Sequence, residues 1–564
     1  MAIIGVDLGT TNSLVTVWQN DKCVVIPNSF GEELTPSVVS IGDDGEILIG
    51  QIAKERLISH PNLTINSFKR YMGTDKEIKL GDRTFRAEEL SSFVLRKLKS
   101  DAEEYLKEEV TEAVISVPAY FNDYQRSATK IAGQLAGLKV ERIVNEPSAA
   151  ALAYKIDRNE NELNFLVFDI GGGTLDISVI EIFDNIIEVT AVSGDNHLGG
   201  DEFNNIILEY FLNSNNLTKE QLGDKKVASL KKSAEKCKFE LTADENVIVS
   251  MSIIYKYKEY TSYIDNKKLI ELSKGIFARI NKPFNKVLRD SQKTIDGIDE
   301  IILVGGSSKM PIIKAYVEHL CHKKPLCNID PDKLVAVGVG IQAGIKERDL
   351  NIKDILLTDV CPFSLGIETV SDGLLDSEFS PIIERNSVLP TSISRIYTTV
   401  SNYQTSIRIG VYQGESLDLS KNIKLGEFFV DVPPAPAGNE YVEVRFTYDL
   451  NGILEVETKV LSNNNVKKEV IISKGVRLTQ EEIEEKLKSL SKLKINPRDT
   501  DKSKMLKAIG ERLFEESYGT IRNEVLSLLK YYGNALDTHD IIKMNKAYNT
   551  VMDRFKEIDS KWGK

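Results

Sequence analysis

The sequence predicts a multidomain protein in which an α/β domain is followed by an antiparallel β-sandwich and then by an α-helical part. Its 564 residues are more than one hydrophobic core normally organises. Up to about Lys346, short apolar strands alternate with helical stretches, which is typical of an α/β domain. The pattern changes near residue 359 and again near residue 478. We therefore expect domains at residues 1–350, 359–476 and 477–564, with a linker at 351–358.

The second segment is predicted to be all-β. Residues 407–411 (IRIGV) and 442–446 (VEVRF) alternate apolar and polar side chains, as strands with one buried face do. Asn451-Gly452 lies between two such runs and is a strong hairpin signal. A loop or a sheet edge is marked by three prolines, Pro433, Pro434 and Pro436.

The third segment is rich in Glu, Lys and Leu and predicts helices as far as Lys564. Thr479 and Glu482 have the spacing of a capping box, which marks a helix start, and Asn496-Pro497 interrupts the pattern. A solvated helical bundle would explain this composition. Its position after a β module suggests instead a cover for that module.

Composition and charge exclude several classes of protein. Hydrophobic residues make up 41% of the chain and charged residues 28%, which is ordinary for a soluble globular protein. The net charge of -12 argues against a general nucleic-acid binder, because phosphate contacts need clustered Lys and Arg. No apolar run approaches the ~18 to 20 residues that a membrane span needs, and the N-terminal residues are predicted to form a strand rather than a secretory signal. We expect a cytoplasmic protein.

The cysteines indicate a reducing compartment rather than a disulfide framework. There are 5 of them, they are scattered, and no CxxC pair occurs. The nearest approach to a metal cluster has a spacing that matches no zinc pattern and comprises His319, Cys321, His322 and Cys327.

An internal repeat in the first half is the most informative feature. Residues 3–12 (IIGVDLGTTN) and 165–174 (FLVFDIGGGT) both combine a strand, an aspartate and a glycine-rich turn with threonine, and a second strand follows each. Glycines let the backbone approach phosphate oxygens and offer N–H groups to them. Asp7 and Asp169 would repel a polyphosphate unless a cation lay between, so they imply Mg²⁺ held mostly through water.

Two such hairpins facing each other can clamp one triphosphate. The alternative, ordinary glycine-rich turns, would be the better explanation of a single copy, and two copies with an acid at each strand end argue against it. The Walker A pattern GxxxxGK[ST] is absent. A third segment, the strand 301–304 followed by Gly305, Gly306, Ser307 and Lys309 and then by Pro311, would suit an adenosine contact, with Lys309 over the base. The alternative is a tight strand-to-helix turn without a ligand.

With these segments the chain resembles the actin-like ATPase superfamily, and within it the DnaK-type 70-kDa heat-shock chaperones. The resemblance implies an α/β ATPase domain of two lobes, a peptide-binding β-sandwich and a helical lid. It rests on strings that run in family order over about 400 residues, namely VDLGTTNS, VPAYFNDYQRSAT, VNEPSAAALAY, VFDIGGGTLDIS, HLGGDEF, LVGGSSKMP, DVCPFSLGIET and VYQGE.

The resemblance implies a role for each matching residue. Lys69, Glu146, Asp169 and Thr174 would be catalytic, and Asp7, Asp169 and Asp176 would organise Mg²⁺ and K⁺. The residues that would contact ATP are Gly9, Thr10, Thr11, Asn12, Gly171, Gly172, Gly173, Gly199, Gly200, Asp201, Glu235, Lys238, Thr242, Gly305, Gly306, Ser307 and Lys309. These are positioning and charge-stabilising roles, and phosphoryl transfer needs little else from a protein.

Two further sets follow from the resemblance. An extended peptide would be held by backbone hydrogen bonds and apolar pockets at Ile367, Val370, Tyr397, Val400, Ile407 and Ile409, although each of these would also suit an ordinary sandwich core. Residues that would relay nucleotide state or meet partners are Pro118, Arg126, Arg142, Leu356, Leu357 and Asp359, for which structural packing is the competing explanation. The implied partners are client polypeptides, a J-domain co-chaperone and a nucleotide exchange factor.

Several departures from DnaK favour the specialised HscC-like branch and a narrower set of clients. The chain between Arg70 and Thr111 is short, so one ATPase subdomain is trimmed. Thr358 replaces an apolar linker residue, and Phe239 stands where some members place an arginine on the adenine. The string CPFSLG and the short helical tail point the same way.

The leading hypothesis is therefore an ATP-dependent chaperone whose slow hydrolysis controls peptide binding. A sugar-kinase-type enzyme of the same superfamily is a second reading, but it has no use for the β module. A non-enzymatic adaptor that binds ATP and serves another chaperone is a third, and Lys69, Glu146, Asp169 and Thr174 speak against it.

Overall fold

The chain forms two compact units, residues 1–479 and 480–564. The computed structural model describes residues 2–28, 30–42, 47–157, 162–326, 330–347, 355–370, 377–450 and 452–471, and most of 519–562 together with a few residues between 506 and 514. The predicted capping box at Thr479 and the break at Asn496-Pro497 lie outside the described residues.

The first unit begins with a sheet of mixed strand directions, in the order β11-β10-β1-β2-β3, with β4 paired to β2. Its strands are β1 (Ala2–Asp7), β2 (Asn12–Gln19), β3 (Lys22–Ile26), β4 (Thr35–Pro36), β10 (Val110–Val117) and β11 (Lys139–Asn145). Beside it lie a three-stranded sheet and a hairpin, formed by β5 (Val38–Ile41), β6 (Ile47–Ile49), β7 (Thr64–Asn66), β8 (Ile78–Leu80) and β9 (Arg83–Phe85).

A second large sheet has the order β17-β12-β13-β14-β18-β21. Its strands are β12 (Glu162–Ile170), β13 (Leu175–Phe183), β14 (Ile186–Asp195), β17 (Glu300–Val304), β18 (Leu356–Val360) and β21 (Val388–Leu389). The strand β18 pairs in parallel with β14, so part of the predicted linker is a strand of this sheet. A separate hairpin is formed by β15 (Val249–Tyr255) and β16 (Lys258–Ile264).

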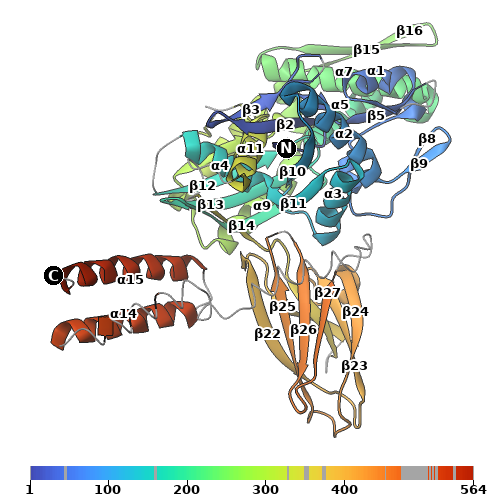
Figure 1. Ribbon diagram of the computed structural model, residues 1–564. Helices are drawn as coiled ribbons and strands as arrows, with labels where there is room; N and C mark the ends of the chain where they lie inside the picture. The colour runs from blue at the N-terminus through green and yellow to red at the C-terminus, as the bar shows by residue number, and fades with distance from the viewer. Residues whose placement is uncertain are drawn as a thin grey trace. The chain divides into compact units, whose positions relative to one another are not determined.

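Helices cover both faces of the two large sheets (Figure 1). They are α1 (Gln51–Ser59), α2 (Ala87–Leu106), α3 (Asp123–Leu135), α4 (Glu146–Asp157), α5 (Gly200–Ser214), α6 (Lys219–Leu222), α7 (Asp224–Ala243), α8 (Asn266–Leu272), α9 (Lys274–Asp290), α10 (Pro311–Cys321) and α11 (Leu334–Lys346). Short 3₁₀ turns lie at η1 (Pro61–Leu63), η2 (Phe68–Tyr71), η3 (Ile295–Gly297) and η4 (Gly306–Lys309).

The alternation of side chains along each strand builds these layers. In β10, Ile115 and Val117 belong to the core that α2 and α3 cover, whereas Val114 belongs to the core around α4 and α11. In β12, Phe165 and Val167 face α4 and α11, whereas Leu166 and Phe168 face α5, α7, α9 and α10. The helices α4 and α11 therefore lie between the two sheets, and we call the parts built on the first and the second sheet the first and the second lobe.

The β-rich part consists of two four-stranded antiparallel sheets around one core. One sheet contains β20 (Ser377–Ile383), β19 (Leu365–Val370), β23 (Ser406–Gln413) and β24 (Ile423–Asp431), and the other β22 (Thr391–Thr398), β25 (Tyr441–Tyr448), β26 (Leu454–Val460) and β27 (Val466–Ile471). The short turn η5 (Leu419–Lys421) precedes β24. The predicted hairpin is confirmed, because β25 and β26 pair on either side of Gly452, whose φ is 74°. The predicted loop at the three prolines separates β24 from β25.

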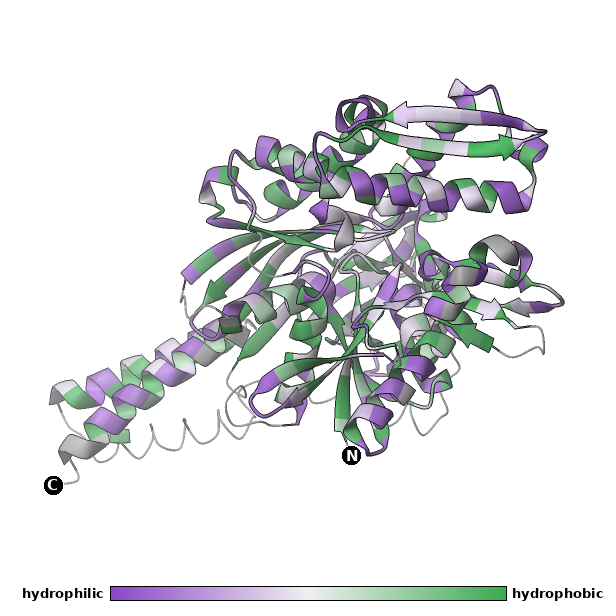
Figure 2. Cartoon of the chain, turned by 90° about the horizontal axis from the view of Figure 1, so that it is seen from above, coloured by the Kyte–Doolittle hydropathy of each residue, from purple (hydrophilic) through white to green (hydrophobic). Residues whose placement is uncertain are grey.

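The second unit contains the helices α14 (Gly519–Asp537) and α15 (Ile541–Trp562). They pack together around Val525, Val551 and Phe555, each no more than 1% exposed. Figure 2 shows that hydrophobic and hydrophilic residues alternate along both helices, as expected of helices that bury one face. Among the described residues, no helix combines the length and the apolar character needed to cross a membrane.

Candidate active site

The two predicted hairpins face each other where the two lobes meet. The first turn joins β1 to β2, and the second joins β12 to β13, where Asp169 and Asp176 are paired residues. A Cβ atom added to Gly172 would lie 1.8 Å from the hydroxyl oxygen of Thr11. Only glycine therefore allows the second turn to approach the first this closely. Asp7, Thr10, Thr11, Asn12 and Gly171 to Thr174 are brought together, as the repeat predicts.

The carbonyl groups of Gly171 and Gly172, in the turn of the second hairpin, accept hydrogen bonds from the start of α5 and from Ser307. Gly200 N–H donates to the Gly171 carbonyl at 3.0 Å, and Asp201 N–H donates to the Gly172 carbonyl at 2.9 Å. The Ser307 hydroxyl also donates to Gly171, at 2.8 Å. In a trans peptide the N–H points opposite to the C=O. The N–H groups of Gly172 and Gly173 therefore point away from α5, where they can serve an anion.

Four carboxylates lie beside these turns, of which three are buried and the fourth, that of Asp7, is half-buried. Asp169 is 6% exposed, Asp176 1% and Glu146 7%, and Asp7 accepts a hydrogen bond from the Ser116 hydroxyl at 2.7 Å. Asp176 accepts one from the Tyr120 N–H at 2.9 Å. The second carboxylate oxygens of Asp169 and Asp176 are buried and find no hydrogen-bond partner among the described residues. Such unpaired oxygens are suitable ligands for a hard cation or for its bound water.

The pKa values reflect this crowding of negative charge. Burial, with the charge of Glu146 as the next cause, raises the pKa of Asp7 to about 7. The same two causes raise the pKa of Asp176 to about 7. The pKa of Asp169 lies well above its usual range, because of burial and the charges of Glu146, Asp176 and Asp7. The site is therefore short of positive charge, and Mg²⁺ fits it.

Lys69 supplies one positive charge to this cluster. It lies on η2, is only 4% exposed, and donates to Glu146 Oε1 at 2.9 Å. Glu146 is the first residue of α4, where the helix dipole favours a negative charge. The Lys69 ammonium also lies 5.5 Å from the centre of the Phe121 ring. The structure thus brings together two residues that are 77 positions apart in the sequence.

The remaining predicted nucleotide contacts lie on the second lobe. Gly199 precedes α5, and Lys238 donates to the Gly200 carbonyl at 3.3 Å. Burial lowers the pKa of Lys238. Thr242 donates to the Lys238 carbonyl at 2.8 Å, within the helix that also carries Glu235. Pro311 is the first residue of α10, as predicted.

Lys309 has partners that the sequence did not indicate. Its ammonium forms ion pairs with Asp330 at 2.7 Å and Asp332 at 2.6 Å. These two carboxylates raise the pKa of Lys309 more than burial lowers it. The contact of Lys309 with a nucleobase stays a prediction, and in this structure its charge is already balanced.

The comparison with protein families settles the affiliation. The sequence matches the Hsp70 protein family over residues 3–80 and 74–560. The chain belongs to the Hsp70 family. Hsp70 proteins are ATP-dependent chaperones with ATPase activity, they bind ATP and ADP with Mg²⁺, and in general they act on client polypeptides with J-domain and exchange-factor co-chaperones. The match does not distinguish an HscC-like branch, which stays a prediction.

In this Hsp70 the predicted peptide-groove residues have different environments. Ile367 and Ile409 are 2% and 3% exposed and belong to the core of the sandwich. Ile407 and Tyr397 pack against that core, and the Tyr397 hydroxyl bonds that of Ser380 at 3.0 Å. Val370 and Val400 are more than half exposed. Of the six, these two valines are therefore the side chains most accessible to a ligand.

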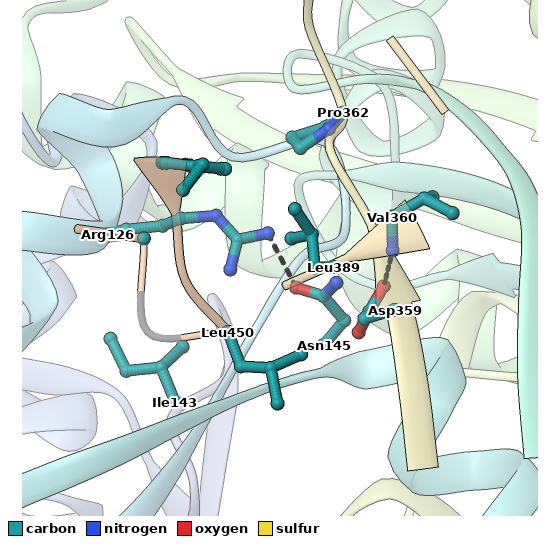
Figure 3. Close-up of a pocket in the computed structure, with 10 residues that line it drawn as sticks. Arg126, Ile143, Asn145, Asp359, Val360, Pro362, Leu389 and Leu450 are labelled. Atoms are coloured by element: carbon teal, nitrogen blue, oxygen red, sulfur yellow. Dashed lines mark hydrogen bonds between the residues drawn. The ribbon is translucent and has the colours of Figure 1, made fainter. Parts of the chain in front are cut away.

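Two of the predicted relay residues, Arg126 and Asp359, lie where α3 and β18 meet the β-rich part (Figure 3). Arg126 donates to Asn145 at 2.6 Å and to the carbonyl of Phe121 at 3.1 Å. Asp359 accepts from the Ser148 hydroxyl at 2.9 Å, and burial raises its pKa. The cavity at this junction is lined by both Arg126 and Asp359 and is closed on the β side by Leu389, Tyr448 and Leu450.

The other relay residues are in or beside the same layer. Leu357 is 8% exposed and belongs to the core between the sheets, while Leu356 pairs with Ile186. Burial lowers the pKa of Arg142, and the negative charge of Asp359 partly opposes this shift. The carbonyl of Pro118 accepts from the N–H of Phe121 at 3.1 Å.

The sequence analysis did not identify several residues that join the α/β part to the β-rich part. Asp123 accepts a hydrogen bond from the Tyr448 hydroxyl, and its N–H donates to Gln413 at 3.1 Å. Arg385 pairs with Asp290 at 2.9 Å. Each contact joins segments that are far apart in the sequence, so no local pattern marks it. Arg70 and Glu202 are a further missed pair, but each adjoins a residue that the motifs single out, Lys69 and Asp201 respectively.

Proposed function

We propose that this Hsp70 hydrolyses ATP slowly between the two hairpins and uses the hydrolysis to control its hold on extended apolar peptide segments. The ATPase domain would comprise residues 1–350, the linker 351–358, the peptide-binding β-sandwich 359–476 and the helical lid 477–564. The observation that carries the proposal is the group of four carboxylates around Lys69, three of them buried, placed between two glycine-rich turns.

The roles of the residues follow from their positions. Thr10, Thr11 and the N–H groups of Gly172 and Gly173 would bind phosphate oxygens, and Thr174 would bind the terminal phosphate. Glu146 and Asp169 would orient the attacking water, because both offer carboxylate oxygens beside the turns. Lys69 would stabilise the charge that develops on the transferred group. Bound Mg²⁺ would supply further positive charge at Asp7, Asp169 and Asp176, and K⁺ is proposed as a second cation.

Coupling to the β-sandwich is supported by a continuous series of contacts. Asp176 accepts from the N–H of Tyr120, and the Tyr120 ring packs on that of Phe363 with 4.5 Å between the centroids. Phe363 lies just after β18 and leads into the sandwich. A change at the carboxylates thus has a short route to the peptide-binding part. Coupling requires that each state binds ATP and peptide differently.

The trimmed first lobe and Thr358 support the proposal of an HscC-like chaperone with a narrow set of clients. Between Arg70 and Thr111 the structure contains only a small hairpin and α2. A short subdomain offers less surface to an exchange factor, so a dedicated exchange factor is part of the proposal. We propose a reducing, cytoplasmic compartment, since Cys23, Cys237, Cys321 and Cys361 are free thiols.

Single-turnover hydrolysis of ATP in K⁺ and Mg²⁺, with and without an apolar extended peptide, tests the proposal. Slow hydrolysis that the peptide accelerates is the expected result. Lys69→Ala should slow the chemical step roughly 10²- to 10³-fold, as loss of one charge-stabilising donor does, and should leave ATP bound. Unchanged turnover in Lys69→Ala would refute the catalytic assignment, and hydrolysis that no peptide affects would refute the coupling.

A further inference from the structure

Arg70 makes a set of contacts between the two lobes, beside the proposed nucleotide site. Its Nη1 donates to Glu202 Oε1 at 2.9 Å and its Nη2 to Glu202 Oε2 at 2.8 Å, which is a two-pronged ion pair. Asp201 lies 3.8 Å from Nη2, and the Gly172 carbonyl accepts from the same nitrogen at 3.5 Å. Next to it, the Ser67 hydroxyl donates to Asp201 at 2.8 Å.

These contacts join the two lobes. Arg70 belongs to η2, whose Phe68 is buried in the core of the first sheet. Glu202 belongs to the first turn of α5, whose Phe203 is buried in the core of the second sheet. The two partners are 132 positions apart in the sequence. Because each side chain is anchored through a different core, separating the lobes must break the pair.

The pair is more shielded than a surface ion pair. The side chain of Arg70 is 15% exposed and that of Glu202 is 17% exposed. An exposed pair contributes little because water and salt screen it, whereas a shielded two-pronged pair of arginine and carboxylate is among the stronger polar contacts. Glu202 is also fixed by the Gly199 N–H, which donates to its Oε2 at 2.7 Å.

The guanidinium also reaches the phosphate-binding turn. A Cβ atom added to Gly173 would lie 2.6 Å from Arg70 Nε. The Nε–H is buried and finds no acceptor among the described residues. An unused buried donor is costly unless a ligand supplies the acceptor, and an oxygen of a bound phosphate can do so. Arg70 is part of the first lobe, and it therefore contacts two segments of the second lobe and has a donor left beside the phosphate site.

We propose that Arg70 and Glu202 form a latch that holds the lobes closed over bound nucleotide and sets how long the nucleotide stays. The inference rests on the proposed nucleotide site and concerns its regulation. Arg70 acts as a positioning residue, through closure of the cleft. A partner that releases ADP would have to break this pair, so the latch also marks where nucleotide exchange is controlled.

Stopped-flow release of a fluorescent ADP from the full chain tests the latch. The protein is loaded with mant-ADP and Mg²⁺ and chased with unlabelled ADP, in the wild type, Arg70→Ala, Glu202→Gln and the double variant. Glu202→Gln keeps an oxygen for the Gly199 N–H and removes the charge. We expect each single variant to release mant-ADP about tenfold faster, and the double variant to be no faster than the singles, because partners in one interaction are not additive.

Two further variants separate a latch from a general loss of structure. Arg70→Lys keeps the charge without the two-pronged geometry and should recover the slow rate only in part. Arg279→Ala removes another arginine–carboxylate pair, in which Nε and Nη2 both donate to Asp195 Oδ2, at 3.1 and 2.7 Å; this pair lies within the second lobe, so the rate should be unchanged. Higher salt should speed release from the wild type more than from Arg70→Ala.

The outcomes are distinguishable. Release rates of Arg70→Ala and Glu202→Gln within twofold of the wild type, or an additive double variant, would overturn the latch while leaving nucleotide binding intact. Failure of the wild type to bind mant-ADP at all would overturn the proposed function, and the latch with it. Circular dichroism of each variant confirms folding, and if Arg70→Ala is unfolded, Glu202→Gln and Arg70→Lys decide the question.

Discussion

At the scale of single residues, Gly199 shows how tightly the cleft closes. Its backbone is extended, with φ of -177°, but an added Cβ atom would lie 2.6 Å from the backbone of Gly172 and Gly173. Backbone cannot give way as a flexible side chain can. Gly199→Ala should therefore hold the second turn off α5 at a cost of about 1–3 kcal/mol, and weaken ADP binding roughly 10- to 100-fold. Isothermal titration with ADP and Mg²⁺ measures the effect.

A second glycine provides the matched control. Gly275 lies in α9, and an added Cβ atom meets nothing within 4 Å. Gly275→Ala should leave ADP affinity unchanged and raise the free energy of unfolding by about 0.4–1 kcal/mol, because alanine restricts the unfolded chain and favours a helix. Normal ADP affinity in Gly199→Ala would show that the cleft does not need this close approach.

The sequence could predict those residues of the site that a repeat makes visible. Asp7 and Asp169 stand at matching places in two strand–turn–strand units, so their meeting follows from the pattern. Arg70 and Glu202 meet only because two cores bring η2 and α5 together. Polar contacts of this kind depend on tertiary packing, and no periodic pattern in a single sequence predicts them. For the same reason, the sequence did not predict that Lys309 pairs with two aspartates, Asp330 and Asp332.

At the scale of elements, the linker strand β18 decides how the two halves of the first unit are joined. It pairs with β14 on one side and β21 on the other, and Leu357 is buried between the sheets. A carboxylate buried there without a partner costs several kcal/mol, so Leu357→Asp should release β18 from the sheet. We expect loss of peptide-stimulated ATP hydrolysis with little change in basal hydrolysis, measured by single-turnover assays.

Thr358 supplies the control for this element. It is 4% exposed, and its hydroxyl donates to the Ile187 carbonyl at 3.4 Å, a long bond. Thr358→Val keeps the shape of the side chain, so the change in stability should stay within about 1 kcal/mol and peptide stimulation should persist. Retained stimulation in Leu357→Asp would mean that coupling does not pass through β18.

The sequence predicted most elements of the fold and missed the role of β18. Alternating or continuous runs of apolar residues predicted strands such as β12, β23 and β25. Pro311 predicted the start of α10. The run at 355–360 was predicted to lie in a linker and at the start of the sandwich. This run pairs with β14, which ends at Asp195, some 160 positions before β18 begins at Leu356. Such a pairing is decided by the tertiary fold, and no local pattern in the sequence indicates it.

At the scale of the whole first unit, the contact between α3 and the sandwich contains a titratable switch. Asp123 is buried between the Tyr448 hydroxyl, Gln413 and Arg126, with Lys130 also acting on its charge. Burial raises the pKa of its carboxyl from 3.8 to about 6. When the sandwich leaves α3, water reaches the carboxylate and the pKa returns towards 3.8. The docked state thus binds a proton more tightly than the undocked state.

The sign of the pH effect follows from linkage. The contribution of Asp123 to docking is complete below pH 3.8 and is lost as the pH rises through about 6. Between pH 5 and pH 7.5 the docking equilibrium should fall about tenfold from this group alone. Burial also raises the pKa of Asp359 at the same junction, which adds to the fall in the same direction. Energy transfer between dyes attached at Lys79 and Asn463 reports the docked fraction at each pH.

Asp123→Asn isolates the contribution of this one carboxyl. The amide keeps the size and can still bond Tyr448, but it does not titrate, so the fall between pH 5 and pH 7.5 should be about tenfold smaller and only the part due to Asp359 should remain. Acidification would then favour the state in which the sandwich stays packed against α3. A wild-type docked fraction that is constant with pH, or an unchanged slope in Asp123→Asn, would show that Asp123 keeps its proton affinity when the sandwich leaves.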